Sequence, residues 1–112
     1  MLIENSGFHH LTKDVDEIEI MASHITIDLN NKQIKSIKCQ NKEEITIRNG
    51  SADSIKCYKV IDLRLTNINI LGHLEFDDCQ LSLKNCKLKG LIKGNNSLLA
   101  TDFIASKKII IY

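Results

Sequence analysis

The 112-residue chain is long enough for one domain, and its 43% hydrophobic content can form a core although only 4% of its residues are aromatic. The formal net charge is +1 and lysines alternate with acidic residues, so no basic block predicts a nucleic-acid partner. There is no signal peptide and no run of about 18 apolar residues, and the four cysteines lack C-x-x-C spacing. We therefore expect no membrane insertion and a reduced, cytoplasmic setting.

Residues 1–17 are the least periodic part of the chain and contain a turn signal at Ser6-Gly7. We expect this segment to form either an N-terminal cap or an irregular first coil. A stack of coils needs such a covering, because its open end presents unpaired backbone groups and core side chains.

From Ile18 onward apolar and polar residues alternate, and one phrase recurs every 18 residues. The four copies are IDLNN, ITIRN, LRLTN and LSLKN, which begin at residues 27, 45, 63 and 81. Alternation is typical of a half-buried strand, because successive side chains point to opposite faces. A fixed phrase at a fixed period predicts a repeat architecture.

An asparagine ends each of these predicted strands, and the column is Asn31, Asn49, Asn67 and Asn85. Asparagine adopts the left-handed backbone conformation more readily than most residues other than glycine, so it suits a sharp corner. Stacked corners also let one side-chain amide donate to the next. We predict a structural ladder of these four side chains, with Asn49 and Asn67 about 4.8 Å apart in adjacent coils.

Three further columns share the 18-residue period: one of small residues, one of apolar residues and one of cysteines. Their members are Ser36, Ser54, Gly72 and Gly90; Ile34, Ala52, Ile70 and Leu88; and Cys39 and Cys57. Small residues suit a tight second corner where a bulky side chain would not fit. We expect the two cysteines to be buried neighbours that act as small apolar residues.

These columns predict an all-β fold, a single-stranded parallel β-helix (β-solenoid) of about six coils, roughly 30 Å long at 4.8 Å per coil. A leucine-rich repeat is excluded because it needs about 20–29 residues. A left-handed hexapeptide helix is disfavoured because steps of six from Ile27 reach the polar residues Gln33 and Ser51. We favour a right-handed β-helix with three short, unequal faces and regular coils over residues 18–98.

Residues 99–112 are predicted to form the final coil and an edge strand that ends on Ile109, Ile110, Ile111 and Tyr112. Both faces of such a strand are apolar, and only one of them can close the core. The other face predicts a contact surface. We therefore expect these four residues to mediate self-association, most simply in a two-fold dimer. The alternative is a monomer in which another segment covers the strand.

The histidines do not predict a metal site. His9 and His10 are adjacent, so on an extended chain they point in opposite directions. Neither His24 nor His73 falls in their column.

The other chemically active residues do not indicate catalysis. Glu75, Asp77 and Asp78 are typical of a solvated turn, although calcium or a basic partner is conceivable there. Cys79 and Cys86 share no column with each other or with the other two cysteines. A nucleophile needs a base and an orienting group, and the sequence indicates neither. We expect no enzyme activity and no cofactor.

Two phrases resemble those of a known family. Ile70-Leu71-Gly72-His73-Leu74 and Leu88-Lys89-Gly90-Leu91-Ile92 share an aliphatic-x-Gly-x-aliphatic pattern, and Cys57-Tyr58-Lys59-Val60 and Ser106-Lys107-Lys108-Ile109 share a small-x-x-aliphatic pattern. Over residues 34–111 these phrases resemble bactofilins. Bactofilins are small bacterial cytoskeletal proteins whose right-handed β-helix polymerises end to end, so the resemblance implies a bacterial structural protein.

Two functions from different classes follow. The first is a non-catalytic structural or scaffolding protein whose partner is itself, as a homodimer or a polymer. The second is a small inhibitor or immunity-type protein that binds another protein and blocks a target macromolecule with a flat solenoid face. A hexapeptide-type acyltransferase or a polysaccharide lyase is disfavoured by the broken hexads and the short chain.

Overall fold

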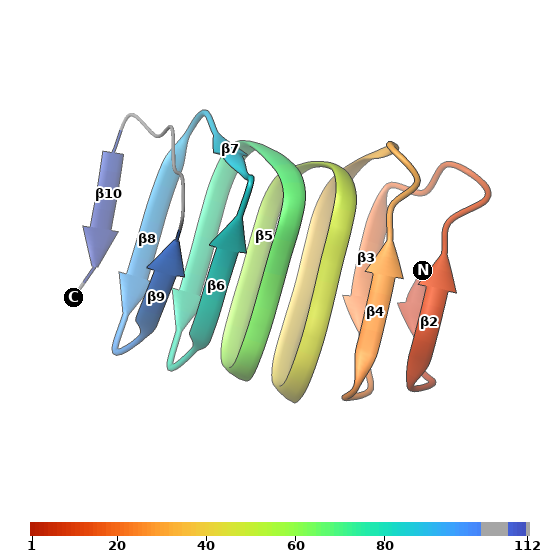
Figure 1. Cartoon of the computed structure of the whole chain (residues 1–112), viewed down its shortest axis with the longest axis horizontal. Coiled ribbons are helices and arrows are strands. Elements are labelled where there is room, and N and C mark those ends of the chain that lie inside the picture. The colour runs from red at the N-terminus through yellow and green to blue at the C-terminus, as the bar shows by residue number, and fades with distance from the viewer. Residues whose placement is uncertain (102–107, 112) are drawn as a thin grey trace.

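The computed structural model describes residues 1–101 and the backbone of residues 108–111, and over this part the chain is an all-β solenoid of parallel strands (Figure 1). The strands are β1 (Leu2–Ile3), β2 (Gly7–His10), β3 (Glu17–Ile20), β4 (Ile25–Asp28), β5 (Gln33–Asp77), β6 (Gln80–Lys84), β7 (Lys87–Leu88), β8 (Leu91–Asn95), β9 (Leu98–Thr101) and β10 (Lys108–Ile111). The 45 residues of β5 run without a break around several corners.

Two sheets lie opposite each other across the core. The front sheet contains β2, β4, β6 and β9, and the back sheet contains β1, β3, β8 and β10, with coils of β5 completing both (Figure 1). Front strands run upward, the chain crosses the top, and back strands run downward as it advances from the N-terminal to the C-terminal end (Figure 1). This path is right-handed. A short third side at the top pairs β7 with residues 69–70 of β5.

The core is a stack of aliphatic side chains that alternation directs inward. Leu63 lies opposite Leu81 and Leu65 opposite Leu83, 18 residues apart as predicted, and all four are buried. No polar or charged residue in the described part of the chain is buried. The molecule measures 33 × 25 × 21 Å, so its longest dimension agrees with the predicted rod.

The predicted register is wrong by two residues at one coil. Ile27 lies opposite Ile47 instead of Ile45. The cause is a longer corner after β4, where Asn30 and Asn31 are both left-handed with φ of 53° and 60°. These two extra residues shift the preceding strand while leaving its inward and outward faces unchanged.

Residues 1–17 form a first coil, which is one of the two predicted possibilities for this segment. β1 pairs with β3, and β2 pairs with β4. Ile3 and Leu11 are buried in the common core, and Val15 packs against it. The N-terminal segment is therefore continuous with the solenoid.

The second corner is as tight as its column of small residues predicts. A Cβ atom added at Gly72 would lie 2.6 Å from the carbonyl oxygen of Asp53, and one added at Gly90 would overlap the carbonyl oxygen of Gly72. Backbone thus approaches backbone where a side chain would otherwise stand. Successive coils can stack closely here only without a side chain at these positions.

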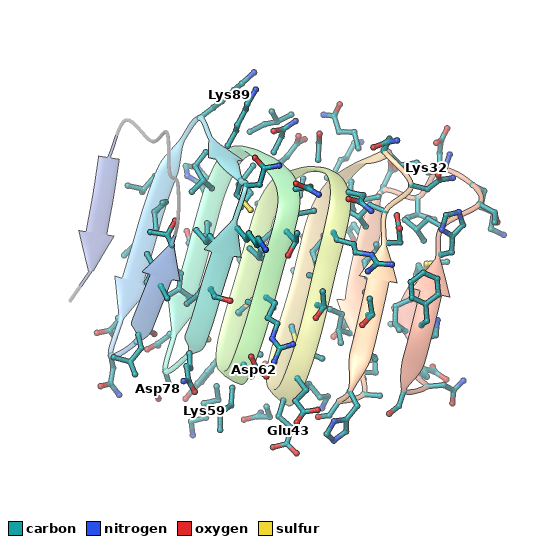
Figure 2. All side chains as sticks on the ribbon, viewed as in Figure 1. Lys32, Glu43, Lys59, Asp62, Asp78 and Lys89 are labelled. Atoms are coloured by element: carbon teal, nitrogen blue, oxygen red, sulfur yellow. The ribbon has the colours of Figure 1, made fainter. Side chains whose placement is uncertain are left out.

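Charged side chains gather at the corners and point away from the core (Figure 2). Glu43, Lys59 and Asp78 lie along the lower edge, and Lys32 and Lys89 along the upper edge (Figure 2). Lys59 and Asp78 are themselves left-handed, with φ of 53° and 52°. The corners therefore carry the solvated charge, while the sheets enclose the apolar core.

Candidate functional site

The asparagine ladder forms along the upper front corner and has one member fewer than predicted. Asn85 Nδ2 donates to Asn67 Oδ1, and Asn67 Nδ2 donates to Asn49 Oδ1 at 3.3 Å. Asn49 Nδ2 then donates to Asp28 Oδ2 at 3.1 Å. Asn31 is displaced by the longer corner, so a carboxylate ends the ladder in its place. The ladder is a structural feature that ties four coils together.

Asp28 is the most strongly held carboxylate of this corner. The backbone N–H of Asn30 donates to Oδ1 at 2.8 Å, and this bond is the main reason that the pKa of Asp28 is lowered. The Asn49 amide and the Arg48 guanidinium, whose Nε lies 3.5 Å from Oδ2, act in the same direction and outweigh the opposing effect of burial. Asp28 is therefore an ionised cap of the corner.

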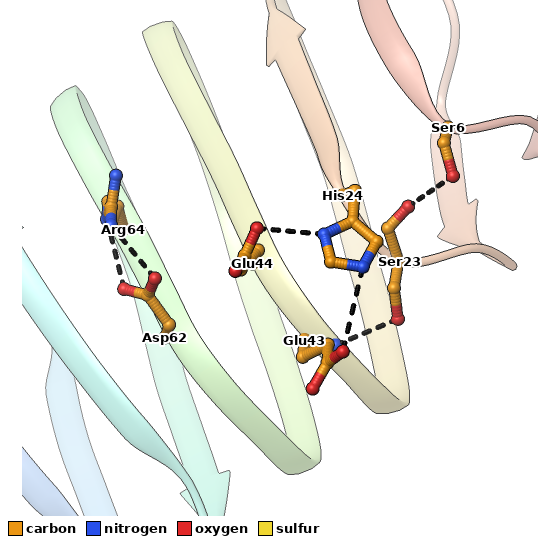
Figure 3. Close-up of polar contacts among 7 residues, drawn as sticks. All are labelled: Ser6, Ser23, His24, Glu43, Glu44, Asp62 and Arg64. Carbon is orange, nitrogen blue, oxygen red and sulfur yellow. Dashed lines mark hydrogen bonds and ion pairs between the residues drawn. The ribbon is translucent and has the colours of Figure 1, made fainter.

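Polar contacts also link the coils along the lower corner (Figure 3). His24 lies between two glutamates, with Nδ1 at 2.8 Å from Glu44 Oε2 and Nε2 at 3.6 Å from Glu43 Oε1. On a neighbouring coil Arg64 forms two hydrogen bonds to Asp62, of 3.0 and 2.9 Å. These groups are exposed, so their ion pairs contribute little to stability.

The histidines are not brought together. His9 and His10 lie on the edge strand β2, His24 occupies the lower corner, and His73 lies on the back sheet. Among the residues that the structure describes, no group of three or more His, Cys, Asp or Glu side chains could hold a metal ion. The described part of the chain thus offers no metal centre.

The cysteines are buried and free. Burial raises the pKa of Cys39 to about 12 and that of Cys57 well above the ordinary thiol value. Cys79 lies near enough for its charge to raise the pKa of Cys57 further, a proximity that the column pattern did not predict because Cys79 belongs to a corner. Thiols that stay protonated are poor nucleophiles, so these side chains act as packing residues.

Both ends of the solenoid present strands that are paired on one side only. In the described chain β1 and β2 pair only with β3 and β4, and β10 and β9 pair only with β8 and β6. Leu2 and Phe8 are exposed at the N-terminal end, and Leu98 is 70% exposed towards the other. The outer edges of these strands therefore offer backbone N–H and C=O groups together with apolar surface.

The residues predicted to mediate self-association fall at this second end. The backbone of Ile109, Ile110 and Ile111 belongs to β10, which pairs in parallel with β8. Their side chains, and the whole of Tyr112, lie outside the described residues. The part of the prediction that concerns which faces are apolar is therefore still a prediction.

One groove of about 540 Å³ crosses the outer surface of the back sheet. One outward-facing residue from each of five successive coils contributes to its lining: Glu19, Lys38, Lys56, Glu75 and Lys93. Cys39 and Cys57 reach its floor from the core side. The sequence pattern did not single out this groove, because each lining residue taken alone is typical of a solvated sheet face.

Comparison with known protein families, with curated proteins and with solved structures finds no match for this chain. No helix with the length and apolar character needed to cross a membrane occurs among the described residues. The functional conclusions below therefore rest on the ends of the solenoid and on its outer faces.

Proposed function

We propose that this protein is a non-catalytic structural or scaffolding protein that self-associates through its terminal coil, as a homodimer or a polymer. The observation that carries the proposal is the set of one-sided strands at the ends of the stack. A strand with a free edge is a template for another strand, because its outward N–H and C=O groups lack partners. A second copy of the chain offers complementary edges.

Apolar exposure near the same strands supports the proposal. Leu98 begins β9, and Phe8 lies on β2 with the Arg48 guanidinium 5.2 Å from its ring centroid. Charge or proline commonly blunts natural edge strands, and the chain contains no proline. The resemblance to bactofilins and the free thiols of the four cysteines are consistent with a scaffolding role in a reduced, cytoplasmic compartment.

The molar mass in solution, measured by light scattering over a concentration series, tests the proposal. We expect the wild-type mass to exceed that of the 12.7 kDa monomer and to rise with concentration. Ile110→Lys should lower it, because a charge would enter the interface. Ile61→Lys is the matched control: Ile61 is 57% exposed at a corner away from both ends, so the same change there should leave the mass unaltered.

A wild-type protein that is monomeric at every concentration would overturn self-association. So would an Ile110→Lys variant with an unchanged oligomer. A monomer would favour the other function class, in which one solenoid face covers a site on a different macromolecule, and capture of a defined partner would then be the next measurement.

A further inference from the structure

The groove on the back sheet has the size of a site for a small molecule. Its volume of about 540 Å³ lies within the range of about 300–1,000 Å³ that is typical of ligand pockets. Its walls come from strands whose register is fixed, since Glu19 lies opposite Lys38 and Glu75 opposite Lys93. The groove is thus part of the rigid sheet, where lining groups keep constant spacing.

The centre of the groove is basic. Lys38 and Lys56 occupy corresponding outward positions on adjacent coils, and Lys42 joins them from the neighbouring corner. The charge of Lys42 acts on the thiol of Cys39 at the groove floor, which places its ammonium group near the same region. Like charges on neighbouring strands repel each other, so an anion held between them would relieve a cost already present in the sheet.

The lysines of the groove have no acidic partner within ion-pair distance. Every ion pair in the described part of the chain involves other cations, even though Glu19 lies in register with Lys38. The ammonium groups of Lys38, Lys42 and Lys56 are therefore available to a ligand oxyanion, with which lysine forms charge-assisted hydrogen bonds.

The groove also offers apolar surface beside this basic centre. Met21 and Tyr58 line it, and both side chains are exposed. Lys59 lies with its ammonium group 5.3 Å from the centroid of the Tyr58 ring, which adds another cation at this wall. An aromatic ring prefers to meet a flat or apolar partner, so a ligand with both a charged group and an apolar body would use both features.

The acidic residues limit the length of such a ligand. Glu19 lies on one side of the basic centre, and Glu75 and Asp77 lie on the other. A long polyanion that followed the groove would meet these carboxylates, and the repulsion would act against it. A short ligand would meet the lysines without them.

We propose that the groove binds a small organic oxyanion, a phosphate monoester or a carboxylate. Its charged group would lie between Lys38, Lys42 and Lys56, and its apolar body would lie against Tyr58 and Met21. This site is independent of the strands through which the chain is proposed to self-associate.

Titration of the labelled protein, followed by amide chemical shifts in ¹H–¹⁵N NMR spectra, tests the proposal. The probes are phenyl phosphate, benzoate, inorganic phosphate and the neutral benzyl alcohol. We expect saturable shifts at residues 38–42 and 56–58 with phenyl phosphate or benzoate, weaker binding of inorganic phosphate, and no such shifts with benzyl alcohol. The tighter of the two aromatic anions identifies whether the site prefers phosphate or carboxylate.

A pair of double variants separates a defined site from general attraction between charges. Lys38→Gln with Lys56→Gln should weaken binding of the aromatic anion at least about tenfold, since two charge-assisted contacts are lost. Lys84→Gln with Lys87→Gln removes the same charge from other faces of the solenoid and should change affinity less than about twofold. The same spectra report whether each variant is folded, and Lys42→Gln, outside the sheet core, serves if the first variant unfolds.

Equal losses in the two double variants would overturn the proposal. Shifts that do not saturate at millimolar probe, or that spread over the front sheet, would do the same. Binding of benzyl alcohol as strongly as benzoate would exclude an oxyanion site. The titration uses protein at a concentration where its mass is constant, so its result does not depend on self-association.

Discussion

Asp28 combines three roles in one side chain that is only 15% exposed. It caps the turn at Asn30, receives the last amide of the asparagine ladder and lies beside Arg48. Because all three interactions favour the charged form, the stability that Asp28 provides depends on pH.

The first prediction concerns that dependence. The folded-state pKa of Asp28 is lowered, so its stabilisation is present above the ordinary aspartate value near pH 4 and is lost as pH falls through the folded value. Asp28→Ala should therefore lower the free energy of unfolding by about 1 kcal/mol at pH 7, and the difference from wild type should shrink below about pH 3. Urea unfolding at both pH values measures this. Asp14→Ala, at an almost fully exposed carboxylate, should show no comparable pH-dependent difference.

The second prediction compares an inward with an outward neighbour on one strand. Leu65 is 0% exposed and stacks on Leu83, so Leu65→Ala should cost about 2–5 kcal/mol through lost burial and a cavity. Arg64 is exposed and pairs with Asp62, so Arg64→Ala should cost less than about 1 kcal/mol. Denaturant midpoints of the two variants measure the difference, and similar midpoints would contradict the assignment of faces.

At the scale of the element, the corner residues decide how strand follows strand. Asn67 shows the two requirements of a corner: its φ is 54°, and its amide both donates to Asn49 and accepts from Asn85. The left-handed backbone and the ladder of side chains are separate contributions, and substitutions can distinguish them.

The third prediction uses two substitutions at this position. Asn67→Ala loses the ladder bonds and also forces an alanine into the left-handed region, whereas Asn67→Gly loses the bonds without that strain. The alanine variant should be less stable than the glycine variant by about 1–2 kcal/mol in equilibrium unfolding. A glycine variant no more stable than the alanine variant would show that the backbone of this corner is not constrained.

The alternation of apolar residues predicted the strands but could not fix every register. A shift of two residues leaves inward residues inward, since side chains alternate with a period of two. Ile27 therefore satisfies the pattern opposite either Ile45 or Ile47, and only the length of the corner decides between them. Small residues predicted the tight corner at Gly72 and Gly90 correctly, because there the constraint acts on a single position.

The outer groove could not be predicted in the same way. Its lysines and glutamates look like ordinary solvated residues in sequence, and they come together only because coils of unequal length stack. Glu19 and Lys38 are 19 residues apart, whereas the regular coils repeat at 18. The position of Cys79 near Cys57 was missed for the same reason.

At the scale of the whole molecule, the four buried cysteines sample the stack from its second coil to its fifth. Their thiols lie in or against one continuous core, so opening that exposes one of them disturbs its neighbours. Reaction of each thiol therefore reports how cooperatively the coils separate.

The fourth prediction is that iodoacetamide modifies none of these thiols in the folded protein at pH 7. The raised pKa of Cys39, about 12, leaves almost no thiolate, and burial excludes the reagent. In denaturant all four should react, with modification rising at the unfolding transition as measured by intact mass. A thiol that reacts well below that transition would reveal a coil that opens by itself.

The coils that follow Leu63 repeat by simple translation, which makes length a countable property of this molecule. Leu63 lies opposite Leu81 and Leu81 opposite Leu99, with the same 18-residue interval throughout. Duplicating residues 63–80 would therefore add one strand spacing, about 4.8 Å, and leave both terminal coils as they are. A gene that gains or loses one such unit changes a ruler by one graduation, so distance between whatever the two ends contact can evolve in fixed steps.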